Sequence, residues 1–511
     1  MEQVSLPRYT EPQTVLTVED MRGSDAACIG AGTPGTELMA RAGRGVFRAV
    51  SWEGPAAILC GTGNNAGDGY VLAALLHEAG IPCRLFLLKE RFSPDGEHYF
   101  RRCLDLGIPW SLWAEGTSLT AYREVVDCLF GTGFRGAAEG LAADMIRAAN
   151  ESGARVIAVD INSGLSGVSG LAEGPCVESD LTVSIGCPQP GHYLGQAKDR
   201  MKRLVNVDIG IPPQGLPIRL MGAGDFFALL PPRPENCNKG DFGTVALLGG
   251  CTAYSGAAKL ANLSLSALRC GCGVARLAVP ASLVQGVLPY VLESTLYPLP
   301  DREGHMVPDR EAIDGALNRT KAAALGMGWG STPENGRILR HILRSYAGAL
   351  VVDADGLNAL AALPDRDQLL HTTAARLVLT PHLREFSRLT GLRREDILRD
   401  PIARAREYAG SRNVILLLKG STTIVTDGGN VLLVSRGCAG MATAGSGDVL
   451  SGVLAGLLGW NAPTPLTAAC GAYLAGLAGE LAQAEKGDIS MVASDTAAKL
   501  PEAIRMVREG K

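Results

Sequence analysis

Residues 56–70 read AAILCGTGNNAGDGY. A short apolar run, typical of a buried β-strand, passes directly into a glycine-rich turn, and a helical pattern follows. Such a turn usually lets the backbone approach the phosphates of a nucleotide, as in the fingerprint G-x-G-x-x-G. Here Asn64, Asn65 and Asp68 stand between the glycines. The stretch therefore predicts a strand–turn–helix unit of an α/β fold whose turn adds polar groups to a nucleotide site.

The alternation of apolar runs and helical stretches continues along the first part of the chain. Residues 13–50 have a helical pattern, interrupted by a glycine–proline turn at residues 30–35. The apolar runs are nearly continuous, as expected where helices cover both faces of a parallel sheet. Further strands are expected at residues 83–88, 125–130, 155–160, 181–186 and 204–210.

A stretch rich in proline and glycine, near residues 211–235, lacks a long periodic pattern and predicts a domain boundary. We expect two different α/β domains, over residues 1–218 and 225–511. In the second, the sequence predicts strands at residues 244–250, 274–280, 322–328, 349–355, 376–382 and 414–420, then a hairpin over residues 422–434 that turns at Asp427-Gly428-Gly429. A helical region rich in glycine and alanine ends the chain.

Composition narrows the class of protein. Hydrophobic residues make up 46% of the chain, charged residues 20%, and the net charge is −4, so neither a nucleic-acid nor a membrane partner is expected. The 13 cysteines form no paired framework, which favours a reducing compartment. The sequence has no visible signal peptide and no apolar run of transmembrane length, so a cytoplasmic location is the expectation.

Polar loops follow several of the predicted strands in the first half. Besides the turn at residues 61–69, these are FGTGFRG at 130–136 and DINSG at 160–164. Loops at the carboxyl ends of parallel strands meet where the strand order reverses, and ligands bind there. Gly61, Gly63 and Gly67 would let the backbone approach a phosphate, and Asp68 would open a helix whose amides favour an anion.

Three oxygen donors lie on these separate loops. Asn65, Asp127 and Ser163 suit a hard, weakly charged cation better than zinc, which prefers cysteine or histidine. The alternative is that these side chains cap helices and turns, and Asp160 has the same alternative.

The motifs GTGNNAGDG, VVDCLFGTGFRG and AVDINSG resemble the NAD(P)H-hydrate epimerase family over roughly residues 15–210. The resemblance implies a Rossmann-like three-layer sandwich that inverts the hydroxyl-bearing carbon of hydrated NADH or NADPH. It implies that Asp160 contacts the hydrated nicotinamide, where it would act as acid or base, and that Asn65, Asp127 and Ser163 bind potassium. The family usually has glycine and proline where this chain has Ala66 and Asn162. The residues implied in substrate binding are Asn64, Asn65, Ala66, Gly67, Asp68, Gly131, Thr132, Gly133, Phe134, Arg135, Gly136, Ala137 and Asp160.

In the second half, the strongest motif is MATAGSGDVLSGVLAGLL at residues 441–458. Glycines and small residues lead into a helix, so the backbone amides of residues 444–447 can form an anion hole. Asp448 lies in the first turn and can accept the proton of a substrate hydroxyl. Other motifs follow predicted strands: KGSTT at 419–423, TPHLREF at 380–386, VVDADGLNAL at 351–360, LGMGWG at 325–330 and LGGCTAYSGAAKLA at 248–261. Each alone is compatible with a structural role.

Together these motifs resemble the ribokinase-like superfamily, and within it the ADP- or ATP-dependent NAD(P)H-hydrate dehydratases, over about residues 225–505. The resemblance implies Mg²⁺, and ADP or ATP as phosphoryl donor. Cys438 and Ala444 replace the family's usual asparagine and glycine. The implied hydrate site comprises Gly328 or Gly330, His382, Asp448 and one alanine of the SGAA run, Ala257 or Ala258; the implied nucleotide site comprises Lys419, Gly420, Ser421, Thr422, Thr423, Cys438, Ala439, Gly440, Met441, Ala442, Thr443, Ala444, Gly445, Ser446 and Gly447.

The leading hypothesis is a bifunctional repair enzyme. One domain interconverts the R and S epimers of hydrated NADH or NADPH, and the other dehydrates the S epimer after phosphorylating its hydroxyl. Hydroxide is a poor leaving group, and phosphorylation of the hydroxyl makes it a good one. Asp448 would remove the hydroxyl proton as the phosphoryl group is transferred. Two alternatives stay open: a small-molecule kinase in the second domain, or a potassium-dependent nucleotide sensor in the first. Family habit favours a homo-oligomer.

Overall fold

The computed structural model describes residues 13–215, 218–263 and 268–510. Within it, the chain divides into two compact units that meet in sequence at residue 218. We call residues 14–218 the N-terminal unit and residues 219–511 the C-terminal unit. Each unit has its own sheet and its own core.

The N-terminal unit is built on a seven-stranded parallel sheet in the order β4-β3-β2-β5-β6-β7-β8. The strand order reverses between β2 and β5, so the loops after these two strands lie at a topological switch point. Its elements are α1 (Val18–Gly30), α2 (Gly35–Ala49), β2 (Ala56–Cys60), α3 (Asn64–Glu78), β3 (Cys83–Leu87), α4 (Pro94–Asp105), β4 (Trp110–Leu112), β5 (Glu124–Cys128), α5 (Gly140–Glu151), β6 (Arg155–Val159), β7 (Leu181–Ile185), the 3-10 turn η1 (Pro190–His192), α6 (Ala197–Arg200) and β8 (Leu204–Val207).

Helices cover both faces of this sheet. Ile58 of β2 packs in a core with residues of α2, α3 and α4. The next residue, Leu59, packs on the opposite face with Met145 and Ile146 of α5. Burial on both faces explains why the strand sequences are continuous apolar runs rather than alternating ones. The predicted three-layer α/β arrangement is confirmed.

The C-terminal unit contributes most of an eleven-stranded sheet in the order β1-β9-β20-β19-β18-β17-β16-β15-β10-β11-β12. The strands from β12 to β18 run parallel, whereas the hairpin β19–β20 is antiparallel. The sheet strands are β1 (Gln13–Val15), β9 (Ile218–Leu220), β10 (Thr244–Leu248), β11 (Val274–Pro280), β12 (Thr295–Leu299), β15 (Ala322–Leu325), β16 (Ala349–Val352), β17 (Arg376–Leu379), β18 (Ile415–Leu418), β19 (Thr423–Thr426) and β20 (Val431–Val434).

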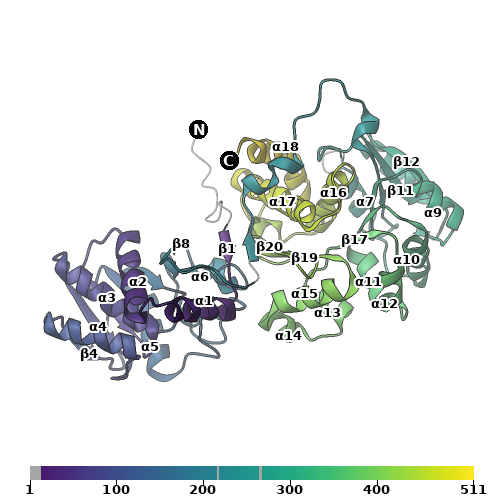
Figure 1. Ribbon diagram of the computed structural model, residues 1–511. Coiled ribbons are helices and arrows are strands. Elements are labelled where there is room, and N and C mark those ends of the chain that lie inside the picture. Colours follow the sequence, from purple (N-terminus) through teal and green to yellow (C-terminus); the bar gives the residue numbers. More distant parts are fainter. Residues whose placement is uncertain (1–12, 216–217, 264–267, 511) are drawn as a thin grey trace. The chain divides into compact units, whose positions relative to one another are not determined.

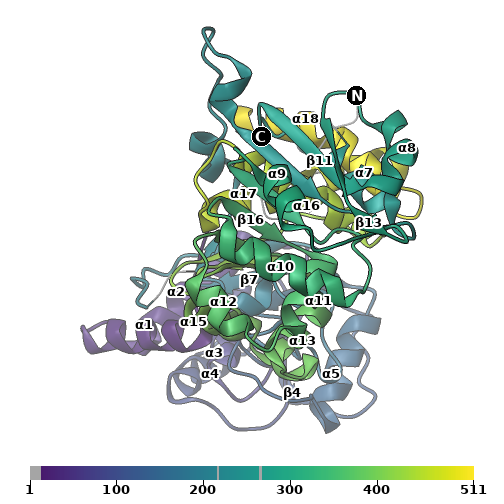
Figure 2. The same cartoon turned by 90° about the vertical axis from the view of Figure 1, so that its right-hand side faces the viewer.

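Two groups of helices enclose this sheet (Figure 1 and Figure 2). The core on one side is formed mainly with α16 and α17, which pack against β10, β15, β16 and the hairpin. The helices are α7 (Ser255–Asn262), α8 (Val284–Val287), α9 (Arg310–Leu317), α10 (Pro333–Ser345), α11 (Ala354–Ala362), α12 (Arg366–Thr372), α13 (Leu383–Thr390), α14 (Arg394–Arg399), α15 (Pro401–Arg412), α16 (Ser446–Leu458), α17 (Pro465–Lys486) and α18 (Ala493–Glu509), with 3-10 turns η2 (Ala223–Leu229), η3 (Lys239–Phe242), η4 (Ala281–Leu283), η5 (Leu288–Tyr290) and η6 (Ala439–Met441) and a small ribbon β13 (Asp301–Arg302) and β14 (His305–Met306).

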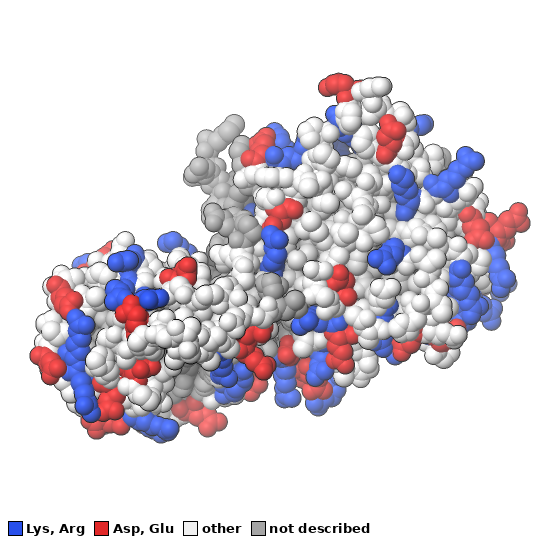
Figure 3. Space-filling view, viewed as in Figure 1, with Lys and Arg blue, Asp and Glu red and all other residues white. Residues whose placement is uncertain are grey.

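The predicted strands and the hairpin at residues 422–434 are confirmed. The expected helical pattern at residues 13–50 is wrong at its start, because residues 13–15 form the short edge strand β1. The edge strands β4 and β12 were not predicted, since both are only partly buried and lack a continuous apolar run. Among the described residues, no helix has the length and apolarity that crossing a membrane requires. Acidic and basic side chains are intermixed on the face in Figure 3.

Candidate functional site

The turn after β2 leads into α3 earlier than expected. The helix begins at Asn64 rather than at Asp68, so the free amides of its first turn belong to residues 64–67 and Asp68 lies in the second turn. The prediction of the helix start is wrong by one turn, because the first turn tolerates both asparagines and Ala66 favours a helix. Ala66 is 1% exposed in the core, and a helical backbone does not require glycine there.

The three glycines of this turn have different surroundings. A side chain at Gly61 would overlap the carbonyl oxygen of Leu129, and one at Gly67 would overlap the thioether of Met39. A Cβ atom at Gly63 would have no neighbouring atom within 4 Å. The protein's own packing therefore requires glycine at Gly61 and Gly67, whereas Gly63 has open space beside it. That these glycines let the backbone approach a phosphate stays a prediction.

The three predicted cation ligands come together around the backbone of Phe130. The Asp127 carboxylate accepts hydrogen bonds from the Ser163 hydroxyl (2.6 Å) and the Ser163 amide (2.8 Å). Asn65 Nδ2 donates to the carbonyl oxygen of Phe130 (2.9 Å), and the Phe130 amide donates to Ser163 Oγ (2.9 Å). Asn65 Oδ1 is buried and has no hydrogen-bond partner among the described residues.

This set fits a hard monovalent cation. An orphaned buried carbonyl oxygen is costly unless something binds it, and the neighbouring donors are oxygens. Burial raises the pKa of Asp127 to about 6, against the lowering effect of the hydrogen bonds from Ser163. A nearby cation would favour the ionised carboxylate.

Asp160 follows β6 in an unusual backbone conformation. Its φ of 66° lies in the left-handed region, which costs energy for a residue other than glycine. Two contacts hold it: Oδ2 accepts from the Thr132 amide (2.8 Å), and the carbonyl oxygen lies 2.7 Å from His192 Nε2. Because His192 Nδ1 accepts from the Gln189 amide (3.0 Å), Nε2 carries the proton and donates to Asp160. No sequence motif points to His192.

The buried side chain of Asn162 fixes the same loop through hydrogen bonds. Its amide nitrogen donates to the carbonyl oxygens of Val177 (2.8 Å) and Arg200 (2.9 Å), and its oxygen accepts from the hydroxyls of Thr182 (2.6 Å) and Ser179 (3.2 Å). The side chain is fully buried. A satisfied polar network therefore anchors the loop where the family usually has proline.

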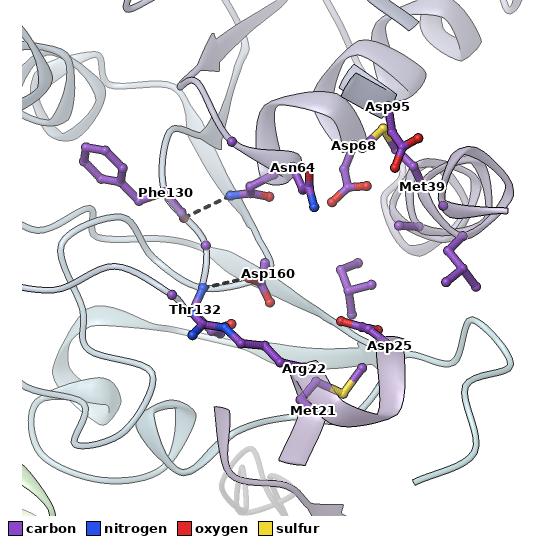
Figure 4. Close-up of a pocket in the computed structure, with 18 of the residues that line it drawn as sticks. Met21, Arg22, Asp25, Met39, Asn64, Asp68, Asp95, Phe130, Thr132 and Asp160 are labelled. Atoms are coloured by element: carbon purple, nitrogen blue, oxygen red, sulfur yellow. Dashed lines mark hydrogen bonds between the residues drawn. The ribbon is translucent and has the colours of Figure 1, made fainter. Parts of the chain in front are cut away.

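These loops open onto a cavity of about 530 Å³, which we call the N-terminal cavity (Figure 4). Its charged lining residues are Arg22, Asp25, Asp68, Asp95 and Asp160. Arg22, Asp25 and Asp95 lie on α1 and α4 and belong to no sequence motif. The predicted residues that line the cavity are Asn64, Asn65, Asp68, Gly131, Thr132, Gly133, Phe134 and Asp160; those that do not are Ala66, Gly67, Asp127, Arg135, Gly136, Ala137 and Ser163.

The cavity favours protonated carboxyl groups. Burial raises the pKa of Asp160, against the lowering effect of the Thr132 amide. Burial, and then the proximity of Asp160, raise the pKa of Asp25 to about 6. The pKa of Asp68 lies well above its usual range because of burial, Asp160 and Asp25. Of these carboxyls, Asp25 has a pKa suited to exchanging a proton near neutral pH.

In the C-terminal unit, Asp448 lies in the first turn of α16, directly after a turn in which Gly445 has a φ of 95°. A side chain at Gly445 would also crowd Leu260, so glycine is needed there on both counts. Burial and then the carboxylate of Asp353 raise the pKa of Asp448 to about 7, against the lowering effect of Lys419. Asp448 is therefore a base of nearly neutral pKa at a helix N-terminus.

A charged network joins three of the motifs. Lys419 Nζ lies 2.8 Å from Asp353 Oδ1, and Ser451 Oγ donates to Asp353 Oδ2 at 2.9 Å. A Cβ atom at Gly447 would lie 3.6 Å from Lys419 Nζ. Burial alone would lower the pKa of Lys419, but Asp353 and Glu385 outweigh it and hold that pKa above its usual range. The KGSTT, DADG and GSGD motifs thus meet around the charged ammonium group of Lys419.

The loops at the second switch point, between β10 and β15, bring Gly328 to α7. With a φ of 64°, a Cβ atom at Gly328 would lie 2.7 Å from the Ala257 side chain. Ala258 instead packs against Gly250 and is fully buried. The Gly330 amide donates to Asp355 Oδ2 (2.8 Å). Of the two candidate alanines, Ala257 is therefore the one next to the glycine loop.

His382 is the residue before α13, and its ring caps that helix. Nδ1 accepts from the amides of Arg384 (3.1 Å) and Glu385 (3.3 Å). Burial and then Lys419 lower the pKa of His382, which favours the neutral ring. The backbone of His382 forms an isolated parallel β-bridge with that of Lys419. This bridge places His382 beside the charged network.

The loop of the predicted nucleotide site is held by α17, which sequence reasoning missed. Glu480 accepts from the Gly437 amide (2.8 Å) and pairs with the buried Arg436 (2.8 Å). Gln483 accepts from the Gly440 amide (2.9 Å). A glutamate inside a buried, alanine-rich helix was the available signal, because such a charge needs a partner.

Both halves of the chain match known families. The model described as NAD(P)H-hydrate dehydratase matches residues 245–502, and that described as YjeF-related protein N-terminus matches residues 35–191. The bifunctional NAD(P)H-hydrate repair enzyme Nnr of Moorella thermoacetica is 35% identical, over 93% of each chain. The chain belongs to the bifunctional NAD(P)H-hydrate repair enzyme family.

The Escherichia coli member of this repair-enzyme family is 30% identical over 95% of this chain and 92% of its own. Among solved structures, the ADP/ATP-dependent NAD(P)H-hydrate dehydratase of Bacillus subtilis, co-crystallized with ATP/Mg²⁺, is 27% identical. It covers 56% of this chain and 98% of its own, with a TM-score of 0.49.

Two positions depart from the usual pattern of the repair-enzyme family near the nucleotide loop. Cys438 has an extended backbone with a φ of −139°, and Ala444 is exposed and has no left-handed φ. The backbone at Ala444 therefore does not require the glycine that the family usually has there.

Proposed function

We propose that the N-terminal unit interconverts the two epimers of hydrated NADH or NADPH, and that the C-terminal unit dehydrates one of them with ADP or ATP. The observation that carries this proposal is that one chain has two aspartates with raised pKa values beside separate glycine-containing turns, Asp160 after β6 and Asp448 at the start of α16. Family membership of both halves supports it. A homo-oligomer in the cytoplasm remains our prediction for the assembly.

In the N-terminal unit, the amides of the first turn of α3 and the open side of Gly63 would hold the pyrophosphate. The hydrated nicotinamide would then face Asp160, which exchanges a proton with it. Asn65, Asp127 and Ser163 would hold K⁺, which supplies a fixed positive charge beside the dinucleotide. The orphaned Asn65 oxygen supports that assignment.

In the C-terminal unit, Asp448 takes the proton of the substrate hydroxyl while the hydroxyl oxygen attacks the terminal phosphoryl group of the nucleotide. The amides of residues 444–447 and Lys419 stabilise the charge of the phosphoryl group. Mg²⁺ bound with the nucleotide would neutralise part of the same charge. The phosphate then leaves with the C–O bonding electrons while the ring nitrogen donates electrons. Loss of a proton from the neighbouring carbon restores the dihydronicotinamide.

The deciding experiment incubates the purified protein with a mixture of hydrate epimers, with and without ADP or ATP. We expect the absorbance of the reduced cofactor to return for the whole mixture only with nucleotide, with release of inorganic phosphate. A stable phosphorylated product would instead identify a kinase. Recovery of only half of a mixture of equal parts would show that the N-terminal unit does not interconvert epimers.

The potassium assignment has its own test. Epimer interconversion is measured in K⁺ and in a large organic cation at equal ionic strength, for wild type and for Asn65→Leu. We expect K⁺ to stimulate only the wild type. Equal stimulation of both proteins would exclude Asn65 as a ligand.

A further inference from the structure

Helix α1 forms a wall of the N-terminal cavity, although no sequence motif lies in it. Arg22 and Asp25 are one turn apart on this helix and both line the cavity. Figure 4 shows Asp25 and Asp160 directed into the same space from α1 and from the loop after β6. Within the described part of the chain, the Asp25 carboxylate has no hydrogen-bond or ion-pair partner. It is a half-buried carboxyl whose pKa is raised by burial and then by the charge of Asp160.

The reaction proposed for this cavity needs two proton-exchanging groups. The carbon to be inverted carries a hydroxyl and is bonded to the ring nitrogen. Cleavage of its bond to nitrogen makes an aldehyde, whose planar carbon can be closed again from the other face. The hydroxyl must lose a proton and the nitrogen must gain one in the same step, so one group must be ionised while the other is protonated.

We propose that Asp25 is the second catalytic residue of the epimerase site, acting on the ring nitrogen while Asp160 acts on the hydroxyl. This inference rests on the proposed epimerase function and adds a residue outside the family's motifs.

The step balances within the two carboxyl groups. Asp160 accepts the hydroxyl proton as the C=O bond forms and the C–N bonding electrons pass to nitrogen, while Asp25 gives its proton to that nitrogen. Rotation about the C–C bond next to the aldehyde presents its other face. On closure, nitrogen attacks the carbon and returns its proton to Asp25, while the oxygen regains its proton from Asp160. Both groups end as they began.

The surroundings of Asp25 favour this role over a role for Asp68. The charged groups that line the cavity are Arg22 on its own helix, Asp68 on α3, Asp95 on α4 and Asp160 after β6. Asp25 and Asp160 are directed into the same space (Figure 4), and a pKa of about 6 lets Asp25 take up and release a proton near neutral pH, whereas burial and both neighbours raise the pKa of Asp68 well above its usual range.

The test compares Asp25→Asn, Asp25→Glu and Asp68→Asn with the exposed Glu19→Gln on the same helix as a matched control. Epimer interconversion by the full-length protein is followed by chromatography without nucleotide, from pH 5 to pH 9. Dehydration of the correct epimer with nucleotide is measured in parallel and reports that each variant is folded.

We expect Asp25→Asn to lower the kcat of epimerisation about 10²-fold or more, with little change in KM and an intact dehydratase. The wild-type pH profile should be bell-shaped, because the rate falls when both groups are protonated and when both are ionised. Asp25→Asn should retain a single limb, Asp25→Glu should recover part of the rate, and Glu19→Gln should match the wild type.

Two results would overturn the inference: a wild-type kcat and bell in Asp25→Asn, or loss of one limb in Asp68→Asn while Asp25→Asn keeps both. A wild-type protein that does not interconvert the epimers would instead contradict the proposed function, so the two failures are distinguishable.

Discussion

At the N-terminal site, Asp160 faces a cavity lined by three further aspartates and Arg22, whereas Asp448 at the C-terminal site lies in a network that contains the Lys419 ammonium. Both aspartates are raised in pKa by burial. Their neighbours differ in what they can do. Carboxyl groups that oppose each other's ionisation retain protons for exchange, while the partly buried Lys419, held charged by Asp353, can stabilise the charge of a phosphoryl group. An aspartate of raised pKa would thus serve proton exchange in one unit and phosphoryl transfer in the other, under the proposed function.

The largest expected effect separates the two sites. Asp448→Asn removes the base from the C-terminal site and should lower the rate of dehydration by about 10²–10⁴-fold. Nucleotide affinity and epimer interconversion should stay close to wild type, because the N-terminal cavity contains no residue of α16. Steady-state rates for both reactions, measured on one preparation, check this. Retention of most of the dehydratase rate would count against proton abstraction by Asp448.

The supports of the two sites also differ. A buried ion pair between Arg436 and Glu480 holds the loop at the C-terminal site. The two side chains are 2% and 7% exposed. Glu480→Gln should lower the free energy of unfolding of the C-terminal unit by about 3–5 kcal/mol, because it leaves the Arg436 charge uncompensated. It should also raise the KM for nucleotide through the Gly437 amide. Denaturant unfolding and nucleotide titration provide the measurements.

Glu485→Gln on the same helix is the matched control. Glu485 pairs with Lys486 and Lys499 at the surface, where water screens the charges. Its unfolding midpoint should match the wild type. Equal effects of the two variants would show that the buried pair does not support the loop.

The loop at the N-terminal site is held instead by the neutral Asn162 network. Asn162→Ala leaves the hydroxyls of Ser179 and Thr182 without the acceptor they share, and should lower the free energy of unfolding of the N-terminal unit by about 1–3 kcal/mol. Epimer interconversion should fall with it, since the displaced loop carries Asp160. Denaturant unfolding and the rate of interconversion measure the two effects. A variant as stable and as active as the wild type would show that the Asn162 network does not hold this loop.

Sequence patterns predicted those parts of both units whose structure follows from the local sequence. Strands buried on both faces, such as β2 and β16, appear as continuous apolar runs. Asp160 directly follows such a run, β6, and Asp448 follows a glycine turn. Asp25 and His192 have no local signature, because each interacts with Asp160, 32 or more positions away. Glu480 contacts residues 43 or more positions away, and its only signal was a charge inside an apolar helix. The start of α3 is misplaced by the sequence pattern because asparagines are typical of loops. Tertiary contacts, not local preference, decide these features.

The smallest expected effect is a difference between two pH profiles. Because Asp448 must be ionised to take the hydroxyl proton and its pKa is about 7, kcat/KM for dehydration should rise with pH up to about 7 and then level off. Below that pH, the rate should fall by about tenfold for each pH unit, as the protonated fraction grows. Epimer interconversion should pass through a maximum instead, since the paired carboxyls must differ in protonation. The phosphates of the nucleotide also titrate in this range, and the residual rate of Asp448→Asn is the control for them. If that residual rate keeps the same acidic limb, the limb belongs to the nucleotide, and the contrast between the two sites does not extend to their pH dependence.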